Sequence, residues 1–113
     1  MSIEDLQREL RRFAADRDWE QFHTPKNLAM ALSVETSELV EIFQWLTPEE
    51  SASVMNAPTA GQGRDELADV AIYLLRLTDV LDVDLEAAIA AKIVRNAHRY
   101  TVEKSKGSAA KSP

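Results

Sequence analysis

Two short acidic steps interrupt apolar helical patterns in this sequence. Glu35 and Glu38 form the first step, and Glu66 and Asp69 form the second. Residues three apart share one face of an α-helix, so each pair projects from a single face. The apolar stripes that they interrupt consist of Leu28, Leu32, Leu39, Ile42 and Leu46 for the first, and Val70, Tyr73, Leu77, Val80 and Leu81 for the second. We therefore expect the two steps to face each other between antiparallel helices.

Four carboxylates that meet in a helical core need either protons or a cation, because like charges repel at close range. Their oxygen atoms suit hard divalent cations, and Mg²⁺ in particular prefers a few carboxylates together with waters and substrate phosphates. We expect a site for a divalent cation, Mg²⁺ first, with Mn²⁺ or Ca²⁺ as the alternatives. The alternative is that the stripes are misphased and the four acids are ordinary solvated residues on helix surfaces.

The composition favours one helical domain. The chain has 113 residues, with only three Gly and four Pro, and it has no Cys that could form a disulfide or a thiolate metal site. Its net charge of −6 disfavours polymeric nucleic acid as a partner, since such binding depends on a basic surface. No signal peptide or membrane-spanning segment is expected, which makes the cytoplasm the default compartment.

The predicted fold is all-α, with a four-helix core and one short extra helix. Apolar periodicity and capping residues predict the main helices at residues 2–16, 25–46, 64–81 and 85–100. A capping box at Thr47–Glu50 predicts the start of the short helix, which residues 51–56 form. Pro and Gly residues predict a loop at 57–63. We expect a single domain at residues 1–103 and a flexible basic tail at residues 104–113.

Several residues outside the acidic steps are candidates for ligand contacts. Trp19 and His23, in the connection before the second helix, form either a stacking wall for a base or a seal at the end of the bundle. Trp45 and Tyr73 are further candidates for stacking or core packing. The inner face of the fourth helix continues as Lys92, Asn96 and Arg99. These side chains either bind phosphate oxygens or extend into solvent at a bundle end.

The chain resembles the MazG-like, all-α nucleoside triphosphate pyrophosphohydrolases, and most closely their dCTP pyrophosphatase branch. The segments that carry the resemblance are DWEQFHTPKNL at residues 18–28, ETSELVEIFQW at 35–45, DELADVAIYLL at 65–75, KIVRNAHRY at 92–100 and KGSAAK at 106–111. E-x-x-E followed by E-x-x-D is a loose pattern on its own. Together with the aromatic and basic segments in this order, it becomes specific.

The resemblance implies Mg²⁺-dependent hydrolysis of a nucleoside triphosphate to the monophosphate and pyrophosphate, with dCTP or a modified pyrimidine deoxynucleotide as substrate. It implies that the four acids are the metal ligands and the catalytic residues, and that Lys92, Asn96 and Arg99 face the triphosphate. It assigns the pocket for base and sugar to Trp19, His23, Trp45 and Tyr73, and it implies a homodimer or homotetramer. The alternatives are a non-catalytic, nucleotide-binding regulatory module and a plain helical interaction protein.

Overall fold

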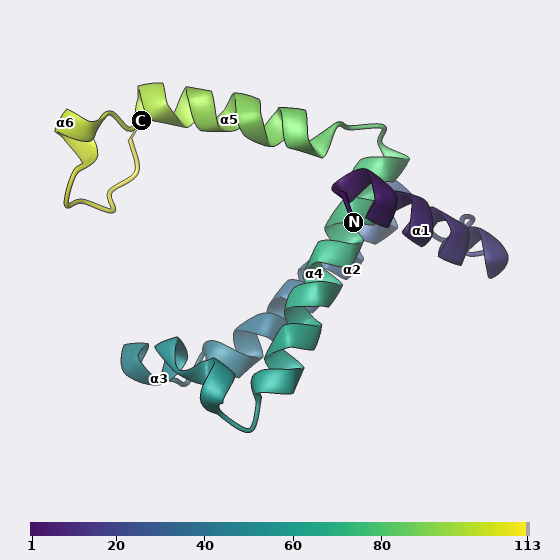
Figure 1. Ribbon diagram of the computed structural model, residues 1–113, viewed down its shortest axis with the longest axis horizontal. Helices are drawn as coiled ribbons and strands as arrows, with labels where there is room; N and C mark the ends of the chain where they lie inside the picture. Colours follow the sequence, from purple (N-terminus) through teal and green to yellow (C-terminus); the bar gives the residue numbers. More distant parts are fainter. Residues whose placement is uncertain (113) are drawn as a thin grey trace. The chain divides into compact units, whose positions relative to one another are not determined.

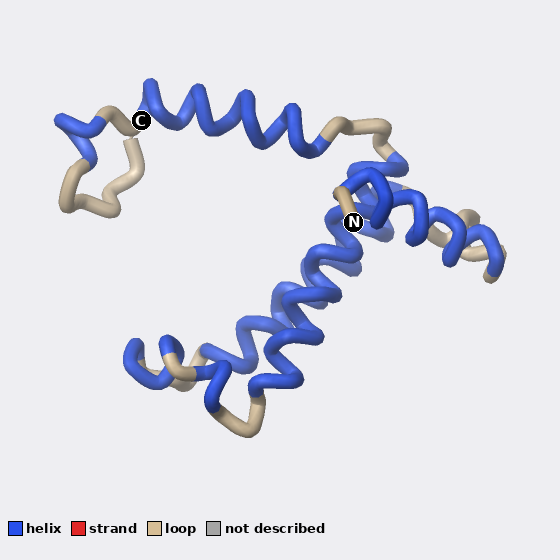
Figure 2. The backbone as a smooth tube through the Cα atoms, viewed as in Figure 1, coloured by secondary structure: helices blue, strands red, loops and turns tan. Residues whose placement is uncertain are grey.

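Every regular element in the described part of the chain, residues 1–112 of the computed structural model, is helical (Figure 2), which confirms the all-α prediction. The elements are α1 (Ile3–Asp16), α2 (Pro25–Phe43), α3 (Pro48–Ala52), the 3-10 turn η1 (Val54–Asn56), α4 (Ala60–Val80), α5 (Leu85–Arg99) and α6 (Val102–Ser105). They form two compact units, an N-terminal unit (Met1–Asp82) and a C-terminal unit (Val83–Pro113). A single four-helix core therefore stays a prediction.

Helices α1, α2 and α3 begin where polar side chains cap them. Ser2 and Asp5 form a capping box on α1, and Thr47 and Glu50 form the same motif on α3. The hydroxyl of Thr24 accepts a hydrogen bond from the amide of Asn27 at 3.2 Å, directly before the Pro at the start of α2. These caps satisfy backbone amides that have no partner within the helix. The predicted starts of these elements are therefore correct to within a few residues.

A tight reversal at the end of α1 sets the position of the connection to α2, which contains Trp19. Asp18 has a φ of 53°, a left-handed conformation that Asp tolerates better than most residues. The Trp19 amide donates to the Ala14 carbonyl at 2.9 Å, and the Asp18 amide donates to the Ala15 carbonyl at 3.1 Å. This pair of bonds is a Schellman motif, which closes the helix and turns Trp19 back towards α1.

Two predicted boundaries are wrong. Helix α2 ends at Phe43, three residues before the predicted end at 46. Helix α4 begins at Ala60, inside the segment predicted as a loop at 57–63, and the Gly63 amide already donates to the Thr59 carbonyl at 2.9 Å. Glycine here does not break the helix, because the missing side chain leaves room for η1: a Cβ at position 63 would lie 3.1 Å from the Met55 methyl group.

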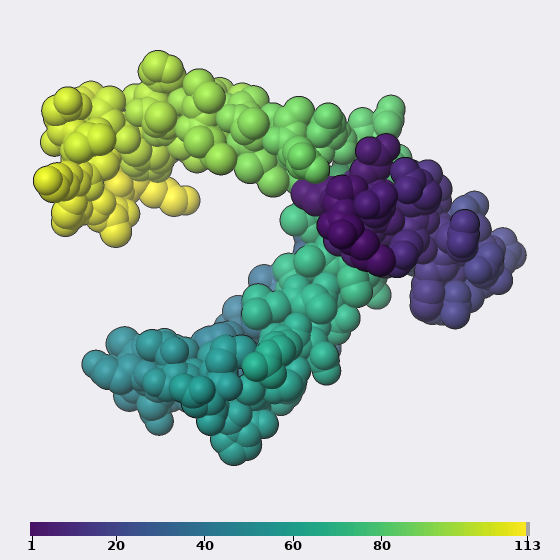
Figure 3. Space-filling model, in the orientation of Figure 1, coloured from purple at the N-terminus to yellow at the C-terminus, as the bar shows by residue number. Residues whose placement is uncertain are grey.

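Helix α4 is the centre of the N-terminal unit, with α2 antiparallel along one side (Figure 1). Helix α1 lies across the C-terminal half of α4 (Figures 1 and 3). The side-chain amide of Gln7 on α1 donates to the Thr78 hydroxyl at 3.2 Å. The second predicted stripe is partly wrong, because Val80 and Leu81 are exposed while Leu75, Arg76 and Thr78 are buried. The apolar stripe shifts because the end of α4 packs against α1 rather than α2.

The C-terminal unit contains α5 and α6. The Asp84 carboxylate caps α5 by accepting from the Ala87 amide at 3.0 Å. Helix α6 covers part of the segment predicted as a flexible tail, and the Arg99 guanidinium donates to the Ser112 carbonyl at 2.7 Å through Nε. Residues 104 and 105 of the predicted tail are therefore helical rather than irregular. Among the described residues, no helix has the length and apolar character needed to cross a membrane.

Candidate functional site

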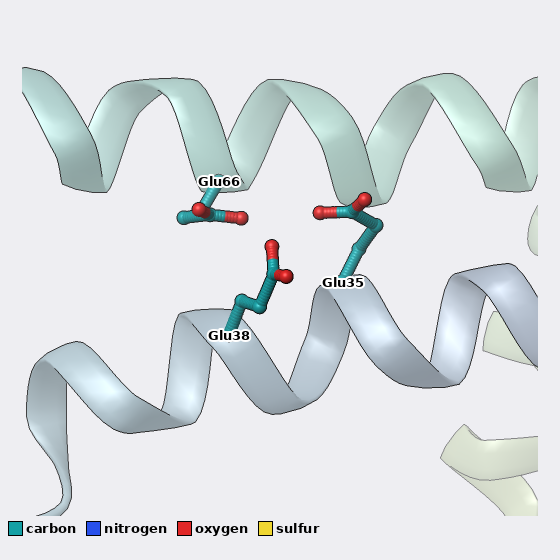
Figure 4. Close-up of side chains that lie close together, drawn as sticks. All are labelled: Glu35, Glu38 and Glu66. Atoms are coloured by element: carbon teal, nitrogen blue, oxygen red, sulfur yellow. The ribbon is translucent and has the colours of Figure 1, made fainter.

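Three carboxylates converge between α2 and α4. Glu35 and Glu38 come from α2 and Glu66 comes from α4, and the three side chains point towards one another across the helix pair (Figure 4). One carboxylate oxygen of each lies within 4.8 Å of the other two. The E-x-x-E spacing places the first two on one face of α2, and antiparallel packing brings Glu66 opposite them. The predicted meeting of the two acidic steps is thus confirmed for these residues.

Two oxygens of this cluster are buried and have no hydrogen-bond partner, Glu35 Oε2 and Glu66 Oε2. Buried polar atoms are nearly always paired, so such atoms indicate a missing partner. Burial raises the pKa of Glu35 to about 7, and the adjacent Glu38 carboxylate adds to this effect. Burial and the Glu38 charge likewise raise the pKa of Glu66. The unpaired oxygens and the repulsion between the carboxylates are both unfavourable. A divalent cation would remove both, because it binds the oxygens and balances their negative charge.

Asp69 lies one turn beyond Glu66 on α4, outside the group of three. It lines a cavity of about 280 Å³ together with Glu35, and its negative charge also raises the pKa of Glu35. The acidic cluster and this cavity are therefore adjacent, and they share Glu35.

Aromatic side chains make up much of the wall of the cavity. Trp19, His23 and Tyr73 line it, with Phe13 and Leu10 of α1. The rings of Phe13 and Trp19 meet edge to face, with centroids 5.7 Å apart, and those of Trp19 and His23 do so at 6.2 Å. An apolar, aromatic cavity with a few polar groups is the common form of a small-molecule site. Beside an acidic cluster, it can hold a planar group while a cation binds the attached anion.

Comparison with known proteins identifies the family. The model of the MazG-like family matches residues 30–112, which include both acidic steps and the basic face of α5. The chain belongs to the MazG-like family. The resemblance that the sequence motifs indicated is therefore confirmed.

Relatives of this MazG-like chain include dCTP pyrophosphatase 1 of Bos taurus, which is 44% identical over 111 residues. The human protein of the same name is 41% identical over 111 residues. These matches cover 97% of this chain, which spans 66% of the bovine relative and 65% of the human one. A crystal structure of a pyrophosphatase from Archaeoglobus fulgidus superposes with a TM-score of 0.81 at 41% identity. That match covers 87% of this chain and 91% of the archaeal one.

Four further predicted site residues of the MazG-like chain are Trp45 in the N-terminal unit and Lys92, Asn96 and Arg99 in the C-terminal unit. Trp45 follows α2 with 86% of its surface exposed and does not line the cavity. Lys92, Asn96 and Arg99 follow one another at helical spacing on α5, in the C-terminal unit. The Arg99 guanidinium donates a hydrogen bond to the Ser112 carbonyl. Ligand binding by these four residues stays a prediction.

One charged residue of the cavity, Arg76, was not among the predicted site residues. It is only 6% exposed, and its Nε donates to His23 Nδ1 at 3.1 Å. The spacing held a signal, because Asp69, Tyr73 and Arg76 follow at intervals of four and three and so share a helical face. Arg76 lies beside the predicted Leu77 stripe, and an Arg beside an apolar stripe is usually solvated. The sequence alone therefore did not single it out.

Proposed function

We propose that this MazG-like chain is a Mg²⁺-dependent nucleoside triphosphate pyrophosphohydrolase. Its substrate is dCTP or a modified pyrimidine deoxynucleotide, and its products are the monophosphate and pyrophosphate. The observation that carries the proposal is the meeting of Glu35, Glu38 and Glu66 beside an aromatic cavity, with two buried oxygens that lack a partner. The names of the relatives, dCTP pyrophosphatase 1 and an archaeal pyrophosphatase, support the same reaction.

The acidic residues fit the metal that this reaction needs. Glu35, Glu38, Glu66 and Asp69 would hold Mg²⁺, because all four offer hard oxygen atoms and two of those oxygens are otherwise unpaired. When bound, Mg²⁺ would supply Lewis-acid polarisation of the phosphates and neutralise their charge. The carboxylates would orient the attacking water, and one of them would accept its proton as the water oxygen bonds to the α-phosphorus. The bond from the α-phosphorus to the bridging oxygen breaks, and pyrophosphate leaves.

The aromatic cavity is suited to the base of the substrate. Trp19 and Tyr73 would stack on or border the ring, and His23 would contact its polar edge. Glu35 and Asp69 line the same cavity, so a nucleotide with its base there would have its phosphates near the acids. The volume of about 280 Å³ is at the small end for ligand sites, and it is enough for one planar base.

Lys92, Asn96 and Arg99 would bind the triphosphate. The support is chemical: ammonium, amide and guanidinium groups donate hydrogen bonds to phosphate oxygens, and these three residues share one face of α5. The resemblance to the family assigns them the same role. In this proposal Trp45 contacts base or sugar, also by the resemblance alone.

The active form would be a homodimer or homotetramer. Four hydrophobic side chains are buried among the described residues, which is few for a chain of this length: Ala14, Leu28, Val54 and Leu75. Many large apolar side chains remain exposed within each unit, for example Val34 at 57% and Ile93 at 62%. Copies of the chain that pack on these faces would supply the missing core.

A product-resolved assay tests the reaction. The protein is incubated with Mg²⁺ and each of dCTP, 5-methyl-dCTP, dTTP, dUTP, dATP and dGTP in water enriched in heavy oxygen, and the products are separated by ion exchange. We expect dCMP and pyrophosphate from dCTP, with the heavy oxygen in dCMP, and slower turnover of purines. Release of inorganic phosphate and dCDP would contradict the cleavage position, and intact nucleotides would favour a binding module.

Matched variants test the acidic residues. Glu38→Gln and Asp69→Asn should each lower kcat/KM for dCTP by at least about a hundredfold, corresponding to about 2.7 kcal/mol. Glu41→Gln, one turn along on the exposed side of α2, is the control and should keep wild-type kinetics. Circular dichroism checks that all three variants fold. Wild-type turnover by the folded Glu38 and Asp69 variants would exclude the acidic cluster as the active site.

A further inference from the structure

A chain of polar contacts leads from the surface of α1 to the cavity. The Arg11 guanidinium binds both oxygens of Asp79, with Nη2 2.7 Å from Oδ1 and Nε 3.0 Å from Oδ2. Asp79 Oδ2 also accepts from Arg76 Nη1 at 3.3 Å, and Arg76 Nε donates to His23 Nδ1 at 3.1 Å. Metal binding by the acidic cluster does not involve these four residues, and they require a separate explanation.

The contact between Arg76 and His23 determines which ring nitrogen carries a proton. A guanidinium has only donors, so His23 Nδ1 must accept and must be unprotonated. A neutral imidazole then carries its single proton on Nε2. An imidazolium would turn an N–H towards the guanidinium, which is unfavourable both as a hydrogen bond and as a charge contact. In agreement, burial and then the Arg76 charge lower the pKa of His23.

The direction of Arg76 is itself set by its neighbours. Arg76 is buried on α4, where a lone cation would be costly, and Asp79 one turn on supplies the balancing charge. Arg11 binds the same carboxylate from α1, which holds Asp79 in place between two guanidinium groups. Arg76 therefore keeps its Nε–H on His23 without any ligand in the cavity.

We propose that Arg76 is a positioning residue that locks His23 in the neutral Nε2–H tautomer, so that His23 offers the substrate a hydrogen-bond donor and never an acceptor. This inference rests on the proposed function, because it concerns the base of the bound nucleotide. The partner atom on the base must be an acceptor. A cytosine ring offers two adjacent acceptors, the O2 carbonyl and the unprotonated N3, whereas N3 of thymine or uracil carries a proton.

Histidine-selective nitrogen-15 NMR on the ligand-free protein at neutral pH tests the tautomer directly and needs no variant. His23 should show one protonated nitrogen, Nε2, and a Nδ1 signal typical of an unprotonated ring nitrogen. His98, which is exposed on α5, is the internal control and should show averaged signals of an ordinary histidine. A protonated Nδ1 on His23, as the other tautomer or as imidazolium, would overturn the proposal.

Two variants test the role of Arg76 in binding. Arg76→Met removes the donor but leaves Asp79 paired with Arg11, and it should mix the His23 tautomers and raise KM for dCTP about tenfold with kcat within about twofold. Arg76→Lys keeps a cationic donor and should restore the tautomer and most of the affinity. Arg8→Met, at an exposed arginine of α1, is the control and should match the wild type.

The outcomes separate this inference from the proposed function. A folded Arg76→Met protein with an unchanged His23 tautomer and unchanged KM would refute the positioning role. If Arg76→Met does not fold, the wild-type NMR signals still test the tautomer of His23, and the KM of Arg76→Lys still tests the positioning role. A wild-type protein that releases no pyrophosphate would refute the function while leaving the tautomer measurement intact.

Discussion

At the scale of single residues, the buried carboxylates are the costliest feature of the chain. Glu35 and Glu66 each place one oxygen between α2 and α4, where it is buried and has no hydrogen-bond partner. A protein gains nothing in stability from such groups, since burial penalises their charged form. Their retention is explained if the cluster serves a cation and a substrate rather than the fold.

The pH dependence of stability follows from Glu35. Its pKa is about 7 in the folded protein, against 4.5 for an ordinary Glu, so the folded state binds the extra proton between these values. The stability that this proton contributes is complete below the unfolded pKa and is lost as the pH rises through about 7. In chelator, the Tm of the wild type should therefore fall relative to that of Glu35→Gln as the pH rises from about 5 to about 8.

His23, whose pKa is lowered, also makes the stability depend on pH. Both the wild type and Glu35→Gln contain His23, so the comparison of their Tm values cancels its contribution. The same series with Mg²⁺ or Mn²⁺ should raise the Tm of the wild type most at high pH, where the carboxylates are ionised and bind the cation. If the Tm of the wild type and the Tm of Glu35→Gln change in parallel with pH, both with and without metal, the pKa of Glu35 is not raised.

At the scale of the elements, α4 organises the N-terminal unit because two of its faces are used. One face carries Glu66 and Asp69 towards α2 and the cavity, and the other packs against α1 through Leu75 and Thr78. Arg76 lies between these faces, which is why it can bind His23 on one side and Asp79 on the other. The start of α4 depends on a third contact, the close approach of η1 at Gly63.

Leucine substitutions at the two glycines of α4 separate helix propensity from packing. Gly61 has no neighbouring atom within 4 Å of a Cβ, so Gly61→Leu should stabilise by about 0.5–1 kcal/mol through propensity alone. Gly63→Leu should destabilise by about 1–3 kcal/mol, because its side chain must displace Met55 and η1. Urea unfolding monitored by circular dichroism measures both. Equal effects at the two positions would contradict the packing of η1 on α4.

At the scale of the whole molecule, exposed apolar surface exceeds what a monomer of this size needs. Met30 and Val34 lie one turn apart on α2, and Ile89 and Ile93 do so on α5, all of them exposed. Two such stripes on separate helices are typical of faces that pack against other copies.

The oligomeric state tests this interpretation. Sedimentation velocity of the wild type should give the mass of a dimer or a tetramer. Val34→Glu should shift the distribution towards smaller species at equal concentration, because a buried unpaired charge opposes association. Gln62→Glu introduces the same side chain at an exposed polar position and should leave the mass unchanged. A monomeric wild type at micromolar concentrations would contradict the proposed assembly.

The sequence by itself determined the helical class, the capped starts of α1, α2 and α3, and the two acidic steps. These features are local: caps act over three residues, and the spacing within one helix decides which side chains share a face. The family could also be recognised, because its motifs are read in order along the chain. The start of α4 could not be placed, since glycine signals a break unless a neighbour such as Met55 needs the space. The end of α2 was also placed three residues too late.

Only the tertiary structure decided which residues meet across helices. It left Asp69 outside the group of three carboxylates, and it shifted the buried face of α4 from Val80 and Leu81 to Leu75, Arg76 and Thr78. It also joined Arg11, Asp79, Arg76 and His23, which come from three separate segments of the N-terminal unit. The physical reason is that packing between helices depends on contacts far apart in the chain, and no periodicity within one helix encodes them.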